Sequence, residues 1–343
     1  MQVKRLAAAL VAATPLFAAA QSTNVTLYGV VDAAIESSDA GGPDGRHTLV
    51  QSGDQSTSRL GFRGTEDLGN GLKAIFNLEA GIAVDTGASD SSGLFQRRAV
   101  VGLEGSFGTV TLGREYSPIA SVAGATDEFG QGFYGSNLSA FGSSNQRLTR
   151  RLANSVNYKS ADLYGFKLLA AYSAGEKTTG PSGDLKSIGA EYTNGGLYLG
   201  GAYAEVKRVG SGNDKEYAAG AAYKFDQLGG FEVKANYLAA DPDGSNNKYQ
   251  QYNLGAGYPF GANKILVNLQ QQKLANGAKA NAWALAYSYA LSKRTNLYAT
   301  YASLNNNGLA TFALNSSSNN LTPPATSLGG DPSVFTVGVR HSF

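Results

Sequence analysis

Two histidines are the side chains that could carry acid–base chemistry. His47 follows Asp44 and precedes Asp54, so an Asp–His pair of the hydrolytic kind is conceivable. His341 shares the alternation of an apolar strand face near the C-terminus, which is a poor place for proton transfer. The sequence contains no cysteine, no metal-ligand cluster, no phosphate-binding loop and no dinucleotide fingerprint. A hydrolase therefore depends on His47 alone, and neither a cofactor nor a metal is expected.

The N-terminal segment has the three regions of a secretory signal peptide. Lys4 and Arg5 precede an apolar run from Leu6 to Phe17, and Ala18–Ala20 supply the small residues of a cleavage site. We expect residues 1–20 to be removed on export. The formal net charge of +2 then falls to zero, because both basic residues of the segment are lost. No overall field favours nucleic acid as a partner.

Apolar and polar side chains alternate with a period of two along most of the remaining chain. In residues 231–237 the apolar and aromatic side chains take the odd positions, while Glu232, Lys234 and Asn236 take the even ones. Residues 265–270, 282–289 and 335–343 repeat this alternation. A period of two indicates β-strands with one apolar face. Aromatic residues close the apolar face at its ends, as in the aromatic girdles of membrane barrels.

The connections between these segments alternate between short and long, which indicates antiparallel strands with all short turns at one end. The segments number about sixteen, with both termini at the short-turn end. A closed barrel of this width is too wide for apolar side chains to fill, so its interior must hold water. The apolar face must then meet lipid. The sequence therefore predicts an all-β fold, a 16-stranded antiparallel transmembrane β-barrel.

Several motifs resemble those of the general porins of Gram-negative outer membranes, with the β-proteobacterial branch nearest. They are "SRLGFRGTEDLGNGLKAIFNLEAG", "RRAVVGLEGSFGTVTLGREYSP", "RLANSVNYKS" and the final "FTVGVRHSF". The resemblance covers essentially the whole of residues 21–343, which we expect to form a single barrel domain. It implies short periplasmic turns, long extracellular loops and passive diffusion of ions and small hydrophilic solutes rather than enzymatic activity.

The resemblance also implies partners. The family forms homotrimers in the outer membrane, among its lipids and lipopolysaccharide. The terminal residue, Phe343, matches the signal that the barrel-assembly machinery reads. No nucleic-acid partner is implied.

In such porins the third long loop folds into the barrel and narrows the pore. Here that loop corresponds to about residues 115–149, which are too long for an ordinary connection. Glu128 matches an acidic position of the family loop, and Asp127 stands beside it, where relatives more often have proline. The resemblance implies that both carboxylates line the constriction. The alternative is that they cap a short helix within the loop.

A ladder of arginines faces this loop in the family. The matching positions are Arg59 in "SRLGF", Arg98 in "RAVVGL" and Arg151 in "RLANSV". Strand alternation places all three opposite apolar neighbours and therefore toward the lumen. Glu79 in "FNLE" has the same inward parity, whereas Val30 stands where some relatives have a lysine. The alternative is that these arginines are ordinary lumen charges away from the narrowest point.

The charges of this set bear on selectivity. Arginine stays ionised at any working pH, so a row of arginines facing carboxylates sets up a field across the passage. Three arginines against two loop carboxylates indicate a mild preference for anions. The competing function is a substrate-specific channel for organic acids, phosphate or sugars, and a barrel hydrolase is the further alternative.

Overall fold

The computed structural model describes residues 24–89, 93–142, 147–177, 179–208, 212–244 and 247–343. The expected signal peptide, residues 1–20, lies outside this part of the chain. Among the described residues, neither the α-helix nor the two 3₁₀-helices reach the length and apolarity needed to cross a membrane.

The described chain is built mostly of strands. The third loop, residues 117–150, carries α1 (Pro118–Ala125) and the 3₁₀-helix η1 (Asn137–Phe141), and η2 (Asp226–Leu228) lies in a turn. The strands are β1 (Asn24–Asp39), β2 (Arg46–Ser52), β3 (Arg59–Gly69), β4 (Leu72–Ala83), β5 (Ala88–Ser89), β6 (Arg98–Gly105), β7 (Gly108–Tyr116), β8 (Arg151–Lys159), β9 (Phe166–Ser173), β10 (Leu185–Asn194), β11 (Leu197–Val206), β12 (Asp214–Phe225), β13 (Phe231–Asp241), β14 (Tyr249–Phe260), β15 (Asn263–Leu274), β16 (Lys279–Ala290), β17 (Thr295–Asn306), β18 (Leu314–Asn315), β19 (Asn320–Leu321) and β20 (Ser333–Ser342).

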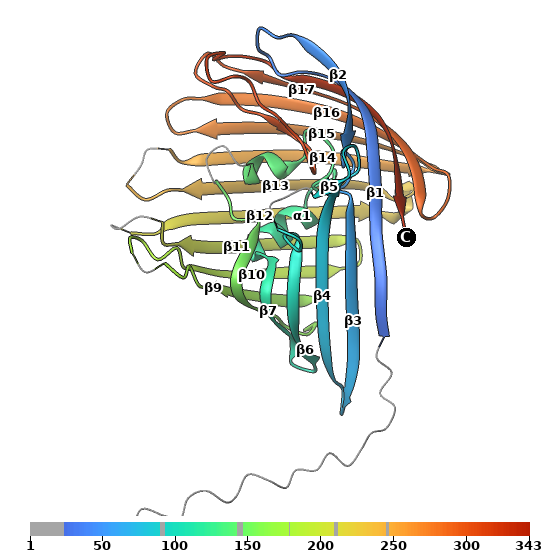
Figure 1. The fold of residues 1–343 in the computed structure, drawn as a ribbon, viewed down its shortest axis with the longest axis vertical. Coiled ribbons are helices and arrows are strands. Elements are labelled where there is room, and N and C mark those ends of the chain that lie inside the picture. The colour runs from blue at the N-terminus through green and yellow to red at the C-terminus, as the bar shows by residue number, and fades with distance from the viewer. Residues whose placement is uncertain (1–23, 90–92, 143–146, 178, 209–211, 245–246) are drawn as a thin grey trace, which may run out of the picture.

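Each wall strand pairs antiparallel with its neighbours in the sequence, and the sheet closes where β1 meets β20, from Val30↔Ser342 to Asp39↔Ser333. In Figure 1 the first and last strands accordingly run side by side. Strands β2 and β3 both pair with β1 and form one interrupted wall strand, and β5 only extends the hairpin of β4. Counted in this way, the described residues form a closed barrel of 16 antiparallel strands, which confirms the prediction from the sequence.

Large apolar side chains cover the outside of the barrel, as the alternation predicted. On β16, Trp283 is 47% exposed, whereas the next residue, Ala284, is 2% exposed. The same strand continues with exposed Leu285 and Tyr287 and with buried Ala286 between them. Such an outer surface is stable only in contact with lipid, because exposed apolar area in water costs free energy.

The third loop lies inside the ring of strands (Figure 1) and packs against the inner wall, where α1 contacts β9–β12. Its buried Ile119, Val122 and Tyr134 belong to one apolar cluster with Tyr298 of β17. Phe133 meets Tyr298 edge to face, with ring centroids 5.4 Å apart. The predicted inward fold of this loop is thus confirmed, and part of the lumen is a packed core rather than water.

Candidate functional site

The start of the third loop is a short, well-capped helix. Ser117 is the N-cap, and its hydroxyl accepts a hydrogen bond from the Ala120 N–H at 3.1 Å. Pro118 occupies the first turn, where its missing N–H costs nothing. Thr126 ends the helix, and its hydroxyl donates to the Val122 carbonyl at 2.8 Å. These local signals fix where the helix begins and ends.

The barrel wall makes room for this helix with glycine. A Cβ atom on Gly220 of β12 would lie 2.7 Å from the Thr126 hydroxyl, and one on Gly189 of β10 would lie 3.3 Å from the Pro118 Cβ. A Cβ atom at Gly220 would clash with Thr126, and one at Gly189 would make a contact tighter than usual, so both glycines give the helix room. The helix therefore lies against β10–β12, and the open part of the lumen remains on the opposite side, beside β3–β8.

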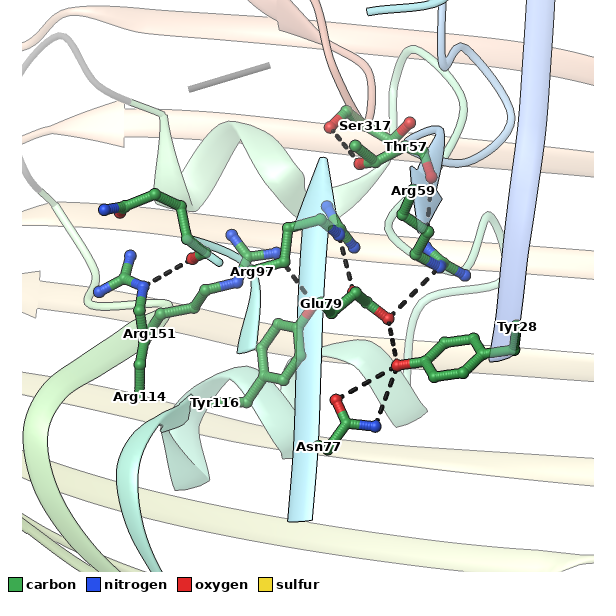
Figure 2. A network of polar contacts seen from close by, with 11 residues as sticks. Tyr28, Thr57, Arg59, Asn77, Glu79, Arg97, Arg114, Tyr116, Arg151 and Ser317 are labelled. Atoms are coloured by element: carbon green, nitrogen blue, oxygen red, sulfur yellow. Dashed lines mark hydrogen bonds and ion pairs between the residues drawn. The ribbon is translucent and has the colours of Figure 1, made fainter. Parts of the chain in front are cut away.

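On that side, the carboxylate of Glu79 on β4 connects several polar groups (Figure 2). Arg97 donates to it from Nε at 2.7 Å, and the Arg59 Nε lies 3.6 Å from its second oxygen. Tyr28 donates its hydroxyl proton to the same second oxygen at 3.0 Å and accepts a hydrogen bond from the Asn77 amide at 3.0 Å. Glu79 thus holds two arginines in place along the wall.

A second group forms around the ring of Tyr116 at the end of β7. Arg151 donates to the Tyr116 hydroxyl at 2.9 Å, and its guanidinium carbon lies 4.8 Å from the ring centroid. Arg150 lies 5.8 Å from the same ring and donates to the Gln131 side chain at 3.1 Å. Burial, followed by the nearby charge of Arg151, lowers the pKa of Arg150 to about 10. The side chain still carries its charge at neutral pH.

A cavity of about 510 Å³ lies between this wall and the third loop. The loop contributes small side chains of α1, such as Ala120 and Ser121, together with Gly130 and Gln131. Among the described residues that line the cavity, Arg59, Arg97, Arg98, Arg150 and Lys159 are basic, and Glu115 is acidic. Glu115 is ion-paired with Arg98 and accepts from its Nε at 2.9 Å.

The predicted basic residues therefore fall into two groups. Arg59 and Arg98 line the cavity, as strand alternation predicted. Arg151 reaches it through Tyr116, which is a lining residue. Glu79 points inward, but its carboxylate is ion-paired with Arg59 and Arg97.

The expectation for the two loop carboxylates is wrong, because both are buried in protein. Asp127 is 1% exposed and accepts hydrogen bonds from the backbone N–H groups of Gln131 at 2.9 Å and Phe129 and Asn137, both at 3.2 Å. Burial raises the pKa of Asp127 to about 6. Asp127 therefore organises the turn after α1. This role is similar to the alternative from the sequence, in which the carboxylates cap a short helix within the loop.

Glu128 points away from the cavity, toward β13–β15. Its carboxylate is fully buried, 2.9 Å from the Lys264 ammonium and 4.0 Å from that of Lys234. Gly255 and Gly257 leave the space it occupies, since a Cβ on Gly257 would lie 2.1 Å from a Glu128 oxygen. Glu128 therefore fastens the loop to the wall opposite the arginines.

Sequence reasoning missed five residues of the site: Arg97, Glu115, Tyr116, Arg150 and Lys159. Lys159 has the inward parity of Arg151 and could have been found in that way. Arg97 and Arg150 each precede a strand, where strand parity does not apply. Only the doubled arginines in the sequence pointed to them.

The histidines do not form the pair that a hydrolase requires. His47 is exposed on β2 and lies opposite Ser38 of β1. Asp54 is buried beside the loop between β17 and β20, where Ser316 and Asn319 approach it. Among the described residues, no carboxylate hydrogen-bonds to His47. His341 contacts the Thr295 hydroxyl at 2.8 Å on the outer face.

The C-terminal residue is built into the wall. The N–H and carbonyl groups of Phe343 exchange hydrogen bonds with Gly29 of β1 at 3.1 and 3.0 Å. Its ring covers Gly29 on the outer face, where a Cβ atom would lie 2.4 Å away. The predicted outward position of Phe343 is thus present in the structure.

A closed barrel with an apolar exterior, a charged lumen and an inward loop defines a transmembrane diffusion channel. Comparison with known proteins gives the particular family. Residues 7–309 match the family model described as Gram-negative porin, and the chain belongs to this family. It is an outer-membrane protein that forms a water-filled channel for passive diffusion of ions and small hydrophilic solutes, and it is not an enzyme.

Individual relatives agree with this assignment. The chain is 36% identical over 364 residues to outer membrane porin protein 32 of Delftia acidovorans, covering 100% of both chains. The solved anion-selective porin from Comamonas acidovorans superimposes with a TM-score of 0.81 at 31% identity, over 94% of this chain and 100% of that one. OmpT of Vibrio cholerae in its trimer form gives a TM-score of 0.68 at 16% identity, over 94% of this chain and 99% of that chain.

Proposed function

We propose that this porin is a general channel with a mild preference for anions. The observation that carries the proposal is the charge around the lumen cavity. Within the described part of the chain, its lining has five basic side chains and one carboxylate, Glu115. The carboxylates of the third loop add no negative charge to the passage, because they are buried. The relative that is described as anion-selective shares 31% of its residues with this chain, which supports the same direction.

The proposed roles follow from the contacts. Arg59 and Arg98 act as the basic wall of the constriction, with Arg97 and Arg150 extending it. Arg151 acts as a positioning residue through Tyr116. Glu79 fixes the direction of Arg59 and Arg97. Guanidinium groups held in this way attract anions without binding them tightly, because their charge is partly neutralised and they remain in contact with water.

The assembly of the channel is part of the same proposal. Residues 1–20 act as a signal peptide, and residues 21–343 form one domain that assembles into a homotrimer among outer-membrane lipids and lipopolysaccharide. The OmpT structure described as a trimer form has the same fold, which supports this oligomeric state. Phe343 acts as the terminal signal for the barrel-assembly machinery, consistent with its place at the seam of β1 and β20.

The reversal potential in a salt gradient tests the selectivity. In a planar bilayer with different KCl concentrations on the two sides, the potential of the native channel should have the sign of chloride preference. Arg98→Ala should shift it toward cation preference, because it removes a positive charge and releases Glu115 from its partner. Glu115→Gln should shift it the opposite way.

Lys293→Ala is the matched control, since Lys293 is an exposed cation in the short turn after β16. It should leave the potential unchanged. Equal potentials for the native channel, Arg98→Ala and Glu115→Gln would overturn the constriction assignment. Saturable block by one solute alone would instead indicate a dedicated channel.

A further inference from the structure

A second cavity, of about 380 Å³, lies at the end of the barrel that carries the long loops. It is bounded by the start of β12, the end of β13, the start of β14 and the end of β15. Arg147, which comes from the last residues of the third loop, lines it together with Tyr249 of β14. The cavity is therefore separate from the arginine wall of β3–β8, and a solute entering from the long-loop end meets it near the mouth.

Arg147 is held in an aromatic corner. Its guanidinium carbon lies 4.2 Å from the ring centroid of Tyr249 and 4.9 Å from that of Phe312, and the two ring centroids are 6.3 Å apart. Contacts of this kind combine cation–π attraction with packing of the planar guanidinium. They restrict the orientation of Arg147 before any ligand arrives.

Both rings of the corner are themselves fixed. The Tyr249 hydroxyl contacts the side-chain oxygens of Gln251 at 2.5 Å and Gln272 at 3.2 Å, in the buried interior. Phe312 is held by its backbone, since its N–H donates to the Asn306 side chain at 2.9 Å and its carbonyl accepts from it at 3.1 Å. The corner is thus a rigid support, which reduces the entropy lost when a ligand binds.

Arg147 differs from Arg208, the other arginine of the cavity, because it has no carboxylate partner among the described residues. Arg208 lies 3.3 Å from Asp214 and 3.1 Å from Glu216, and the remaining lining carboxylate, Asp241, lies 3.1 Å from Lys248. Within the described part of the chain, no ion pair involves Arg147, and its Nε is enclosed without a hydrogen-bond partner. The charge of Arg147 is therefore left for a ligand.

We propose that this cavity is a binding subsite for small aliphatic carboxylates. The guanidinium of Arg147 offers paired N–H donors that match the two oxygens of a carboxylate. The rest of the lining includes the apolar side chains of Ala240, Pro242 and Leu274, which suit a short carbon chain, beside polar ones such as Lys215 and Asn276. The subsite would raise the local concentration of such solutes before they reach the constriction.

This inference rests on the proposed function, because it assumes an open channel. The test uses the full-length porin in a planar bilayer, with butyrate replacing chloride stepwise at constant ionic strength on the long-loop side. The native channel should show a saturable reduction of current with butyrate. Inorganic phosphate and acetate should half-saturate only at higher concentration, because they lack the carbon chain.

Three variants distinguish specific binding at Arg147 from general attraction of anions by the positive charge of the lining. Arg147→Lys keeps the charge but loses the planar donor pair, and should raise the half-saturating butyrate concentration about tenfold. Arg147→Ala should raise it further. Lys215→Ala removes another cation of the same lining that has no aromatic support, and should change it by less than about twofold.

The inference is overturned if Arg147→Lys behaves as the native channel, or if Lys215→Ala matches Arg147→Ala, or if the effect of butyrate never saturates. In each of these cases the channel still conducts when KCl is the sole salt. A channel that does not conduct in KCl would instead contradict the proposed function. Retained compact migration of the unheated variants on denaturing gels shows that their barrels are folded, so that a null result counts against the subsite.

Discussion

Replacing Glu128 by glutamine tests how the third loop is held away from the passage. The carboxylate is fully buried and lies 2.9 Å from the Lys264 ammonium and 4.0 Å from that of Lys234. Glutamine keeps the volume that fills the space over Gly255 and Gly257, so the change is electrostatic. Burial raises the pKa of Glu128, which means that desolvation already offsets part of the attraction.

The magnitude follows from the exposure of the partners. Breaking a fully buried pair costs 3–5 kcal/mol in typical proteins, but Lys264 is 38% exposed and can regain water. A loss of about 2 kcal/mol in the docking of the loop is therefore expected, and it corresponds to an about 30-fold larger population of the undocked loop. An undocked loop moves into the open lumen and reduces the current.

Single-channel recording at neutral pH measures this population as the fraction of time spent in low-conductance states. Glu232→Gln is the matched control, because its carboxylate also lies close to Lys234, at 3.4 Å, but is 26% exposed. It should change the occupancy of those states by a small factor only. Indistinguishable recordings from Glu128→Gln and Glu232→Gln would refute the view that Glu128 holds the loop.

Three further changes have defined outcomes. Burial raises the pKa of Asp127 from 3.8 to about 6, so the folded state binds this proton more tightly than the unfolded state does. Stability should therefore fall as pH rises from about 4 to about 6 and stay level above, and Asp127→Asn should remove this component from thermal unfolding curves. Gly220→Val should lower the unfolding free energy by about 1–3 kcal/mol, since its Cβ would lie 2.7 Å from the Thr126 hydroxyl. Gly201→Val is the control, because a Cβ at Gly201 meets nothing within 4 Å. Equal melting temperatures of the two variants would contradict the packing argument. Phe343→Ala should reduce the amount of folded porin in the outer membrane of cells while leaving refolding of the purified chain in detergent nearly unchanged; an equal defect in both would indicate a stability effect rather than a lost assembly signal.

The strands and their orientation were predictable because their signals are local. The alternation around Trp283 and Leu285 needs only neighbouring residues to be recognised, and the structure confirms that these side chains face outward. The identification of the lumen face followed from barrel width, since a wide barrel cannot pack its interior with its own wall side chains. Arg59 and Arg98 lie on strands whose parity is defined, so an inward direction could be predicted for them, and both line the cavity; their role at the constriction stays a prediction.

The interior arrangement was not predictable in this way, because it depends on contacts between distant segments. Glu128 enters a space that exists only because Gly255 and Gly257, more than a hundred positions later, have no side chain. The buried Asp127 carboxylate accepts hydrogen bonds from three backbone N–H groups, which come together only when the loop is folded. A family position rich in acidic residues does not reveal toward which wall its carboxylate points.

This placement changes the electrostatic view of the channel. Arginines facing carboxylates across a gap set up a strong transverse field with one path for cations and another for anions. Here the carboxylates nearest the arginines, Glu79 and Glu115, lie on the same wall and are paired with them, while Glu128 is buried at the opposite wall beside Lys264. The loop side of the cavity carries small uncharged side chains such as Ala120 and Ser121. Along the described part of the loop, a cation therefore finds no separate acidic path. The excess of positive charge on one wall should act on all ions that pass, and its effect should weaken as added salt screens it.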